Sequence, residues 1–385
     1  MLWKHYVFRR GNDVHEMWHD LFQCRPVKLL YITGRGFDIR ARTILEQFAQ
    51  AFASSDAVVM EAEMLLLQLP GYHLSEELQE QTESNEVRLR EIFGSLANAR
   101  TVGIAPVSGE DDVSPSNALQ LSVAAVLDRV SDQTDVVLDI SSLPRVIFLA
   151  ILTGLLNKLI PNKLCGHPLM RSKINLQIVV AEDPILDAHI RSEDPSSDLV
   201  TIPGYSSALH EEAVQDWPLV WFPILGENRL GQLQKVASEI PKSAEICPVL
   251  PHPSRDPRRA DRLIIEYKEP LFDIRRTPTG NILYAHEFNP FEAYRQLLRA
   301  MERYRDSLRI MGGSRLVVTP LGSKLVSVAA GLACFEIRPS EATASYRVGM
   351  PYAEATRYLA DISQWGTSSS ELCALLLTGD AYATE

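Results

Sequence analysis

The sequence predicts an α/β protein with two Rossmann-like halves, each built on a parallel sheet. Short apolar runs alternate with segments of helical length along most of the 385 residues, a pattern typical of strands joined by helical crossovers. One passage also occurs twice in rough form, at residues 136–156 and 315–335. Each copy is an apolar run, a turn of small residues and proline, one basic residue and a long apolar helix. An internal duplication and convergence on a common βα pattern both explain this repetition.

Composition excludes several classes of function. The net charge of −11 argues against a surface for duplex nucleic acid, which requires a basic face. No apolar run reaches the roughly 20 residues of a membrane-spanning helix, so we expect no membrane partner. The five cysteines are scattered without a CxxC pair. This spacing predicts neither a metal site nor a disulfide framework and favours a cytoplasmic location.

The order of these segments predicts four regions. Residues 1–27 are expected to form an N-terminal helical segment, and residues 28–182 the first Rossmann-like half. Residues 183–216 are rich in proline, serine and acidic side chains, which predicts a linker. Residues 217–385 then form the second Rossmann-like half.

Individual elements follow from hydrophobic periodicity. Strands are expected at the short apolar runs, at residues 28–33, 57–60, 101–107, 135–140, 173–180, 219–225, 245–250, 281–286 and 345–349. Helices are expected where apolar side chains recur every three or four residues, at 3–24, 41–53, 85–97, 117–130, 230–240, 260–267, 291–308 and 352–362. The two repeated passages add a helix each, and the second passage also adds a strand.

The turn GRGFDIR follows the first strand of the first half. Gly34 and Gly36 allow a close backbone approach, and Arg35 and Arg40 can pair with phosphate oxygens. Ile39 occupies the position of the third glycine of a dinucleotide fingerprint. We therefore expect no dinucleotide cofactor, and the sequence predicts no other cofactor. A tight turn with solvated arginines is the alternative.

The turn DISSLPR in the first repeated passage carries four polar groups. Asp139 ends an apolar strand, where an unpaired carboxylate costs several kcal/mol. It either accepts hydrogen bonds from the turn or Arg145, or it serves as a general base or a ribose contact. Ser141, Ser142 and Arg145 are suited to hold a phosphate at the start of a helix. A helix N-cap network is the alternative.

In the second repeated passage, the turn between the strand and the helix is TPLGSK. Gly322 and Ser323 open the apolar helix, and Lys324 follows where it can contact a phosphate. A P-loop is excluded, because the earlier glycine is missing and the lysine follows the serine.

Two more turns of the second half carry candidate residues. GENR places Arg229 after a strand, as GRGFDIR places Arg35. His286 follows another strand, where it can act as an acid or base. Capping of the helix that begins at the Asn-Pro pair 289–290 is the alternative role of this segment.

Two Rossmann-like halves, with strand-end turns such as TPLGSK (319–324) and DISSLPR (139–145), resemble the CARF and SAVED sensor domains. That resemblance implies a cyclic oligonucleotide held between two such units, a partner protein as effector and a role in bacterial antiviral defence.

The function expected from these features is that of a ligand-binding or adaptor subunit. It would recognise a phosphorylated, nucleotide-like small molecule in a crevice between the halves and signal to a protein partner. One alternative is an enzyme acting on a nucleotide or sugar phosphate, such as a transferase or nucleosidase, with Asp139 or His286 as general base. The other alternative is a structural subunit of a larger complex, with the arginine-rich helix 291–308 as its interface.

Overall fold

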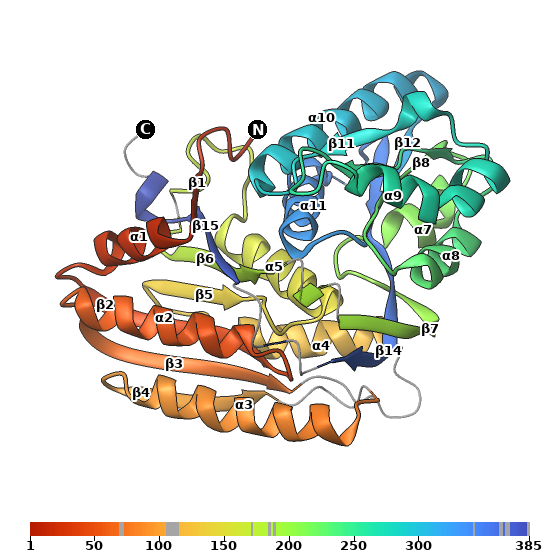
Figure 1. Ribbon diagram of the computed structural model, residues 1–385. Coiled ribbons are helices and arrows are strands. Elements are labelled where there is room, and N and C mark those ends of the chain that lie inside the picture. The colour runs from red at the N-terminus through yellow and green to blue at the C-terminus, as the bar shows by residue number, and fades with distance from the viewer. Residues whose placement is uncertain are drawn as a thin grey trace. The chain divides into compact units, whose positions relative to one another are not determined.

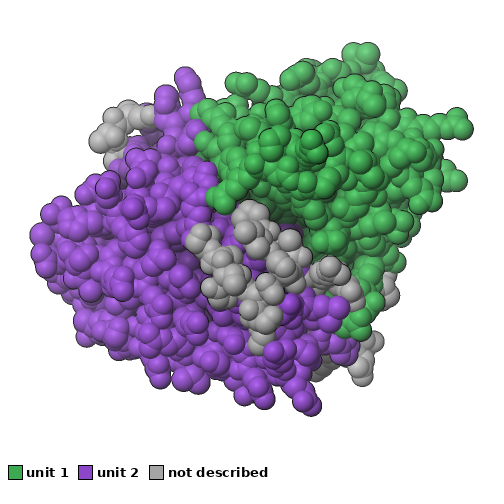
Figure 2. All heavy atoms as spheres, viewed as in Figure 1, with its two compact units in different colours: residues 1, 192–357 green, residues 2–191, 358–385 purple. Residues whose placement is uncertain are grey.

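The computed structural model describes residues 1–68, 73–104, 115–170, 172–183, 186–187, 190–341, 343–361, 365 and 370–382. They form two compact units (Figure 2). Unit 1 comprises Met1 and residues 192–357, and unit 2 comprises residues 2–191 and 358–385. Each unit is built on a mainly parallel sheet with helical connections, which confirms the predicted α/β fold class.

Unit 2 contains a seven-stranded sheet in the order β1-β15-β6-β5-β2-β3-β4. The strands from β6 to β4 are parallel, whereas β15 and β1 run antiparallel at one edge (Figure 1). The strands are β1 (Val7–Arg10), β2 (Pro26–Arg35), β3 (Val58–Gln68), β4 (Ala99–Ile104), β5 (Asp135–Asp139), β6 (Asn175–Glu182) and β15 (Glu371–Thr378). The helices are α1 (Asn12–Phe22), α2 (Arg40–Ser54), α3 (Glu76–Gly94), α4 (Pro115–Leu127) and α5 (Arg145–Leu159).

The core of unit 2 is rich in aromatic side chains on one face of the sheet. There α1, α2 and α3 pack against alternate residues of the central strands. Trp18 and Phe48 meet edge to face, with ring centroids 5.1 Å apart, and Tyr31 of β2 lies against Phe48. The apolar helix α5 is buried along almost its whole length, as expected of a helix that is hydrophobic on all sides.

Unit 1 contains a second parallel sheet, in the order β11-β10-β8-β12-β13, with β9 also paired to β8. Its strands are β8 (Leu219–Ile224), β9 (Glu245–Ile246), β10 (Val249–Pro251), β11 (Leu283–Ala285), β12 (Ser314–Pro320) and β13 (Tyr346–Gly349). Its helices are α7 (Ser207–His210), α8 (Leu230–Glu239), α9 (Arg259–Glu266), α10 (Pro290–Leu308) and α11 (Lys324–Ile337). All residues of β8 and β12 are buried, as in the central strands of a covered sheet.

The two units share one strand order. In chain order, the five parallel strands of each unit are arranged 3-2-1-4-5, which is β4-β3-β2-β5-β6 in unit 2 and β11-β10-β8-β12-β13 in unit 1. The chain reverses direction across the sheet between β2 and β5, and again between β8 and β12. In open parallel sheets, ligands bind outside the carboxyl ends of the strands at such a switch point. An internal duplication stays a hypothesis.

The boundaries of the units differ from the predicted regions at both termini. Residues 1–27 contain the strand β1 in addition to α1, because β1 pairs with β15 near the other end of the chain. The predicted second half, 217–385, is too long, since residues 358–385 return to unit 2 and supply β15. Pairing between segments so far apart leaves no trace in local periodicity.

The predicted linker and the predicted last helix are also different in the structure. Residues 183–216 include the strand β7 (Ile190–Thr201) and the short helix α7. The helix expected at 352–362 is the strand β14 (Pro351–Ala360). The two strands pair in a separate two-stranded sheet, and the chain passes between the units within them. Apolar periodicity does not reveal this pairing between distant segments.

Replacing Gly226 with alanine tests the packing at the unit 1 switch point. A Cβ atom at this position would lie 2.3 Å from the carbonyl oxygen of Leu321, and relieving such an overlap requires a shift of the backbone. We expect Gly226→Ala to lower the free energy of unfolding by at least about 1–3 kcal/mol, measured by urea denaturation. Gly280→Ala is the control in the same unit, because no atom lies within 4 Å of its added Cβ. Equal effects of the two substitutions would contradict this account.

Candidate functional site

The sheet of unit 2 brings the two turns predicted in the first half together. Because β2 and β5 are adjacent and parallel, with Ile32 opposite Leu138, GRGFDIR and DISSLPR leave the sheet at the same edge. The hydroxyl of Ser142 donates to the carbonyl oxygen of Gly34 at 2.8 Å. A Cβ on Gly34 would lie 2.7 Å from Cδ2 of Leu143. The glycine therefore permits the two turns to pack closely.

Asp139 organises the second of these turns. It is fully buried and accepts hydrogen bonds from the backbone N–H of Ser141 at 2.9 Å and the hydroxyl of Tyr31 at 3.1 Å. This confirms the expectation that the carboxylate is bonded within its own turn. Burial and the Asp139 carboxylate raise the pKa of Tyr31 well above its ordinary value, so its hydroxyl remains a donor. The hydroxyl of Ser141 accepts from the N–H of Ala181 on β6 at 3.1 Å.

Both arginines of GRGFDIR are paired with carboxylates. Nε and Nη2 of Arg40 bind the two oxygens of Asp38 at 2.9 and 2.6 Å, and Nη1 lies 2.8 Å from Asp187. Burial opposes the charge of Arg40, but the two carboxylates outweigh it and raise the pKa of the guanidinium well above its ordinary value. Arg35 is paired with Glu86. These bonds give both arginines a structural role.

Two candidates remain, Gly36 of GRGFDIR and Arg145 of DISSLPR. Arg145 is the first residue of that helix and is half-buried. Pro144 stands at the N-cap position before it and has no side-chain group that could cap the helix by a hydrogen bond. The carbonyl oxygen of Gly36 accepts from the side-chain amide of Asn85 at 3.0 Å. The helix dipole therefore adds to the positive charge of Arg145 at this edge.

Unit 1 repeats this construction at its own switch point. The β8 and β12 strands are parallel and adjacent, with Ile224 opposite Pro320. The backbone N–H of Leu321 donates to the carbonyl oxygen of Ile224 at 3.0 Å. Gly226 occupies the place that Gly34 has in unit 2, since a Cβ there would collide with the turn after the fourth strand.

The TPLGSK turn opens α11 as the sequence predicts. The hydroxyl of Ser323 accepts from the N–H of Val326 at 3.3 Å, which is ordinary N-capping. Gly322 packs over β8, because its Cβ would lie 3.0 Å from Cγ2 of Ile224. Lys324 is the first helical residue and is half-buried. Its charge and the helix dipole both favour an anion at this edge.

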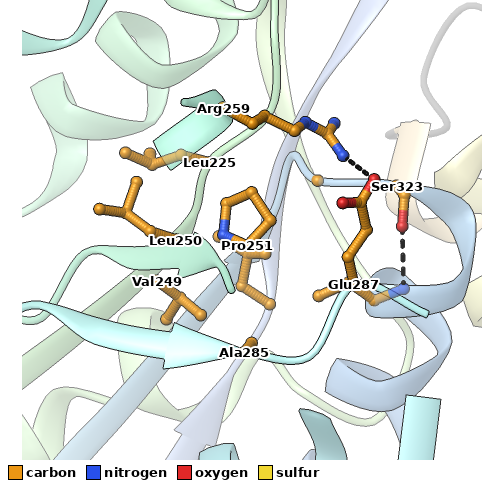
Figure 3. Close-up of a pocket in the computed structure, with 11 residues that line it drawn as sticks. Leu225, Val249, Leu250, Pro251, Arg259, Ala285, Glu287 and Ser323 are labelled. Atoms are coloured by element: carbon orange, nitrogen blue, oxygen red, sulfur yellow. Dashed lines mark hydrogen bonds and ion pairs between the residues drawn. The ribbon is translucent and has the colours of Figure 1, made fainter. Parts of the chain in front are cut away.

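A small hollow lies at the carboxyl edge of the unit 1 sheet (Figure 3). The space inside the hollow is about 10 Å³, which is room for about one water molecule. The mouth of the hollow opens to solvent. It is lined by residues from four strand ends, α9 and α11, namely Ile224, Leu225, Val249, Leu250, Pro251, Arg259, Ala285, Glu287, Gly322, Ser323 and Val326. Its walls are mainly apolar, with polar groups at two places.

Arg259, Glu227 and Glu287 form what we call the Arg259 cluster. Nε and Nη2 of Arg259 each lie 2.6 Å from one oxygen of Glu227, and Nη1 binds Glu287. Burial opposes the charge of Glu227, but the Arg259 guanidinium outweighs it and lowers the pKa of that carboxyl. Sequence reasoning noticed the turns of Glu227 and Glu287 separately and missed the cluster. Glu227 and Glu287 come soon after the ends of β8 and β11, whereas Arg259 is the first residue of α9.

The last two candidates, His286 and Arg229, stand shortly before helices of unit 1. Nδ1 of His286 accepts hydrogen bonds from the backbone N–H groups of Phe288 and Asn289, both at 3.2 Å. Asn289 caps α10 through its side chain, as expected. Arg229 stands at the N-cap position of α8 and is half-buried. His286 thus fixes the turn before α10, with Nδ1 unprotonated.

Across the described ranges, no three His, Cys, Asp or Glu side chains gather in a way that would hold a metal ion. No described helix combines the length and apolarity needed to cross a membrane.

The buried pair of Asp38 and Arg40 provides a test of how this edge of unit 2 is held. Removing one partner of a buried ion pair leaves an uncompensated charge, so we expect Arg40→Met to lower the free energy of unfolding by roughly 3–5 kcal/mol. Arg88→Met removes an exposed pair with Glu46 and should cost about 0–1 kcal/mol. Urea denaturation measures both. Recovery of stability in the double variant Asp38→Leu/Arg40→Met would confirm the cause, and equal effects of the single variants would exclude it.

Comparison with known proteins leaves the family of this chain open. No protein-family model matches it, and no curated protein matches it in sequence.

Proposed function

We propose that this protein is a ligand-binding subunit that recognises a phosphorylated, nucleotide-like small molecule at the carboxyl edge of its parallel sheets. The observation that carries the proposal is the strand order 3-2-1-4-5 in both units, with the predicted polar turns at the two switch points. Proteins with this order bind nucleotides at that place in the sheet.

Unit 1 supplies the better-supported position for a phosphate group. At the start of α11, Gly322 and Ser323 line the hollow. Lys324 and the helix dipole provide positive charge beside the hollow. In unit 2, Arg145 at the start of α5 is the corresponding contact. The shared crevice between the halves stays a prediction.

A signalling role follows only if the ligand prefers one conformation. A ligand shifts a conformational equilibrium by its difference in affinity for the two states. A protein partner would then respond to the favoured state. The resemblance of the two strand-end turns to those of CARF and SAVED domains supports this role, and with it a place in antiviral defence.

Binding by variants at α11 tests the proposal. Native mass spectrometry of the protein purified from its host should find a bound nucleotide-like molecule. Isothermal titration with the four ribonucleoside 5′-monophosphates should show binding that Lys324→Ala weakens by roughly 1–3 kcal/mol, the range for a charge-assisted contact. Arg145→Ala is expected to weaken binding similarly if unit 2 contributes.

Lys242→Ala is the matched control. Lys242 is an exposed lysine of unit 1 that precedes the start of β9, at the opposite edge of the parallel sheet. Its removal should leave the affinity unchanged. No bound molecule and no titratable binding in the wild-type protein would overturn the proposed function.

A further inference from the structure

The unit 1 hollow has polar groups at two places with different chemistry. One is the start of α11, where Gly322 and Ser323 line it. The other is the Arg259 cluster, where Arg259 and Glu287 line it and face each other in Figure 3. Between them the lining is apolar, from residues such as Val249 and Ala285. A ligand that fills the mouth of the hollow therefore meets two different polar ends.

The Arg259 cluster does not suit a second phosphate. It holds one guanidinium and two carboxylates, and all three guanidinium nitrogens bond to Glu227 or Glu287. The cluster thus carries an excess of one negative charge. A phosphate that approached Arg259 would also meet the two carboxylates bound to it, and their negative charge opposes a second anion. Glu287 is 7% exposed, so little water screens this repulsion.

The same cluster suits groups that donate hydrogen bonds. One oxygen of Glu287 bonds to Arg259, and the other accepts from the backbone N–H of Arg255 at 3.2 Å. A carboxylate has about four acceptor sites, so these two bonds leave capacity for hydroxyl donors from a ligand. The Arg259 and Arg255 contacts also hold the carboxylate in one position, which lowers the entropy cost of binding.

From this arrangement we propose that Glu287 is a specificity-determining residue that accepts hydrogen bonds from the sugar hydroxyls of a ribonucleotide. The inference rests on the proposed function, which places the phosphate at the start of α11. The sugar of the same ligand then extends toward Glu287. The ligand class of unit 1 is accordingly a ribonucleotide with its 2′- or 3′-hydroxyl at the Arg259 cluster.

The wild-type protein provides the first test without any substitution. Isothermal titration compares the four ribonucleoside 5′-monophosphates with their 2′-deoxy and 3′-deoxy counterparts. We expect loss of one of the two hydroxyls to lower the affinity about tenfold or more, as for a hydrogen bond to a charged group. Equal affinities for all three sugars would overturn the inference and leave the proposed function intact. Absence of binding to every probe would overturn the proposed function itself.

Variants then assign the discrimination to Glu287. Glu287→Ala should remove the preference for the ribonucleotide while leaving the affinity for the deoxynucleotide unchanged. Glu227→Ala is the matched control, since Glu227 binds the same guanidinium and is not among the residues that line the hollow. It should keep the preference, as should Lys324→Ala, which weakens both ligands alike.

A second outcome would contradict the role of Glu287. If Glu287→Ala weakens ribonucleotide and deoxynucleotide equally, the carboxylate acts only by holding Arg259. If thermal denaturation shows that the alanine variant does not fold, Glu287→Met provides the same comparison with a side chain of similar length that lacks acceptor oxygens.

Discussion

The close approach of two turns at each switch point is the constraint on which the rest of the site depends. Parallel hydrogen bonding up to Ile224 and Pro320 forces the turns after β8 and β12 to leave the sheet together. The carbonyl oxygen of Leu321 then lies where a Cβ of residue 226 would stand. Only glycine fits there. The fit brings Gly322 and Ser323 over the end of β8, where they line the hollow with the ends of β10 and β11.

Charge compensation decides which polar groups at these edges can serve a ligand. A buried charge needs a partner, because desolvation costs several kcal/mol per ion. In unit 2, Asp38 and Asp187 hold Arg40, and the turn itself holds Asp139. In unit 1, Glu227 and Glu287 hold Arg259 beside a hollow. The same topology thus supports different chemistry in the two units.

Local features of the fold were predictable from the sequence, and long-range pairing was not. The apolar runs of β2, β5, β8 and β12 identify their strands because fully buried strands need continuous apolar residues. The strand β14 was mistaken for a helix, since its pairing with the distant strand β7 leaves no signal in local periodicity. The strand β1 was missed for a similar reason, because its partner β15 is at the other end of the chain.

The local features of the candidate site were also predictable from the sequence, whereas its long-range contacts were not. The turns of Asp139 and Lys324 were found because small residues and a charge interrupt an apolar pattern, and the structure places both at switch points. The Arg259 cluster could not be found in this way. Glu227, Arg259 and Glu287 come from three separate turns, and their meeting depends on the order β11-β10-β8. A sequence without an alignment carries no signal of that order.

The Arg259 cluster also limits how a ligand could change the conformation of unit 1. Its ion pairs join the turns after β8 and β11 to the start of α9 in the absence of any ligand. A ligand that adds hydrogen bonds to these existing ion pairs gains affinity. Through that contact, however, it favours no other conformation of unit 1. A difference in affinity between two states must therefore arise elsewhere, because only differential contacts shift an equilibrium. The start of α11 is the other polar end of the hollow. In the proposed sensor, the difference in affinity would therefore have to come from contacts of the ligand at that end.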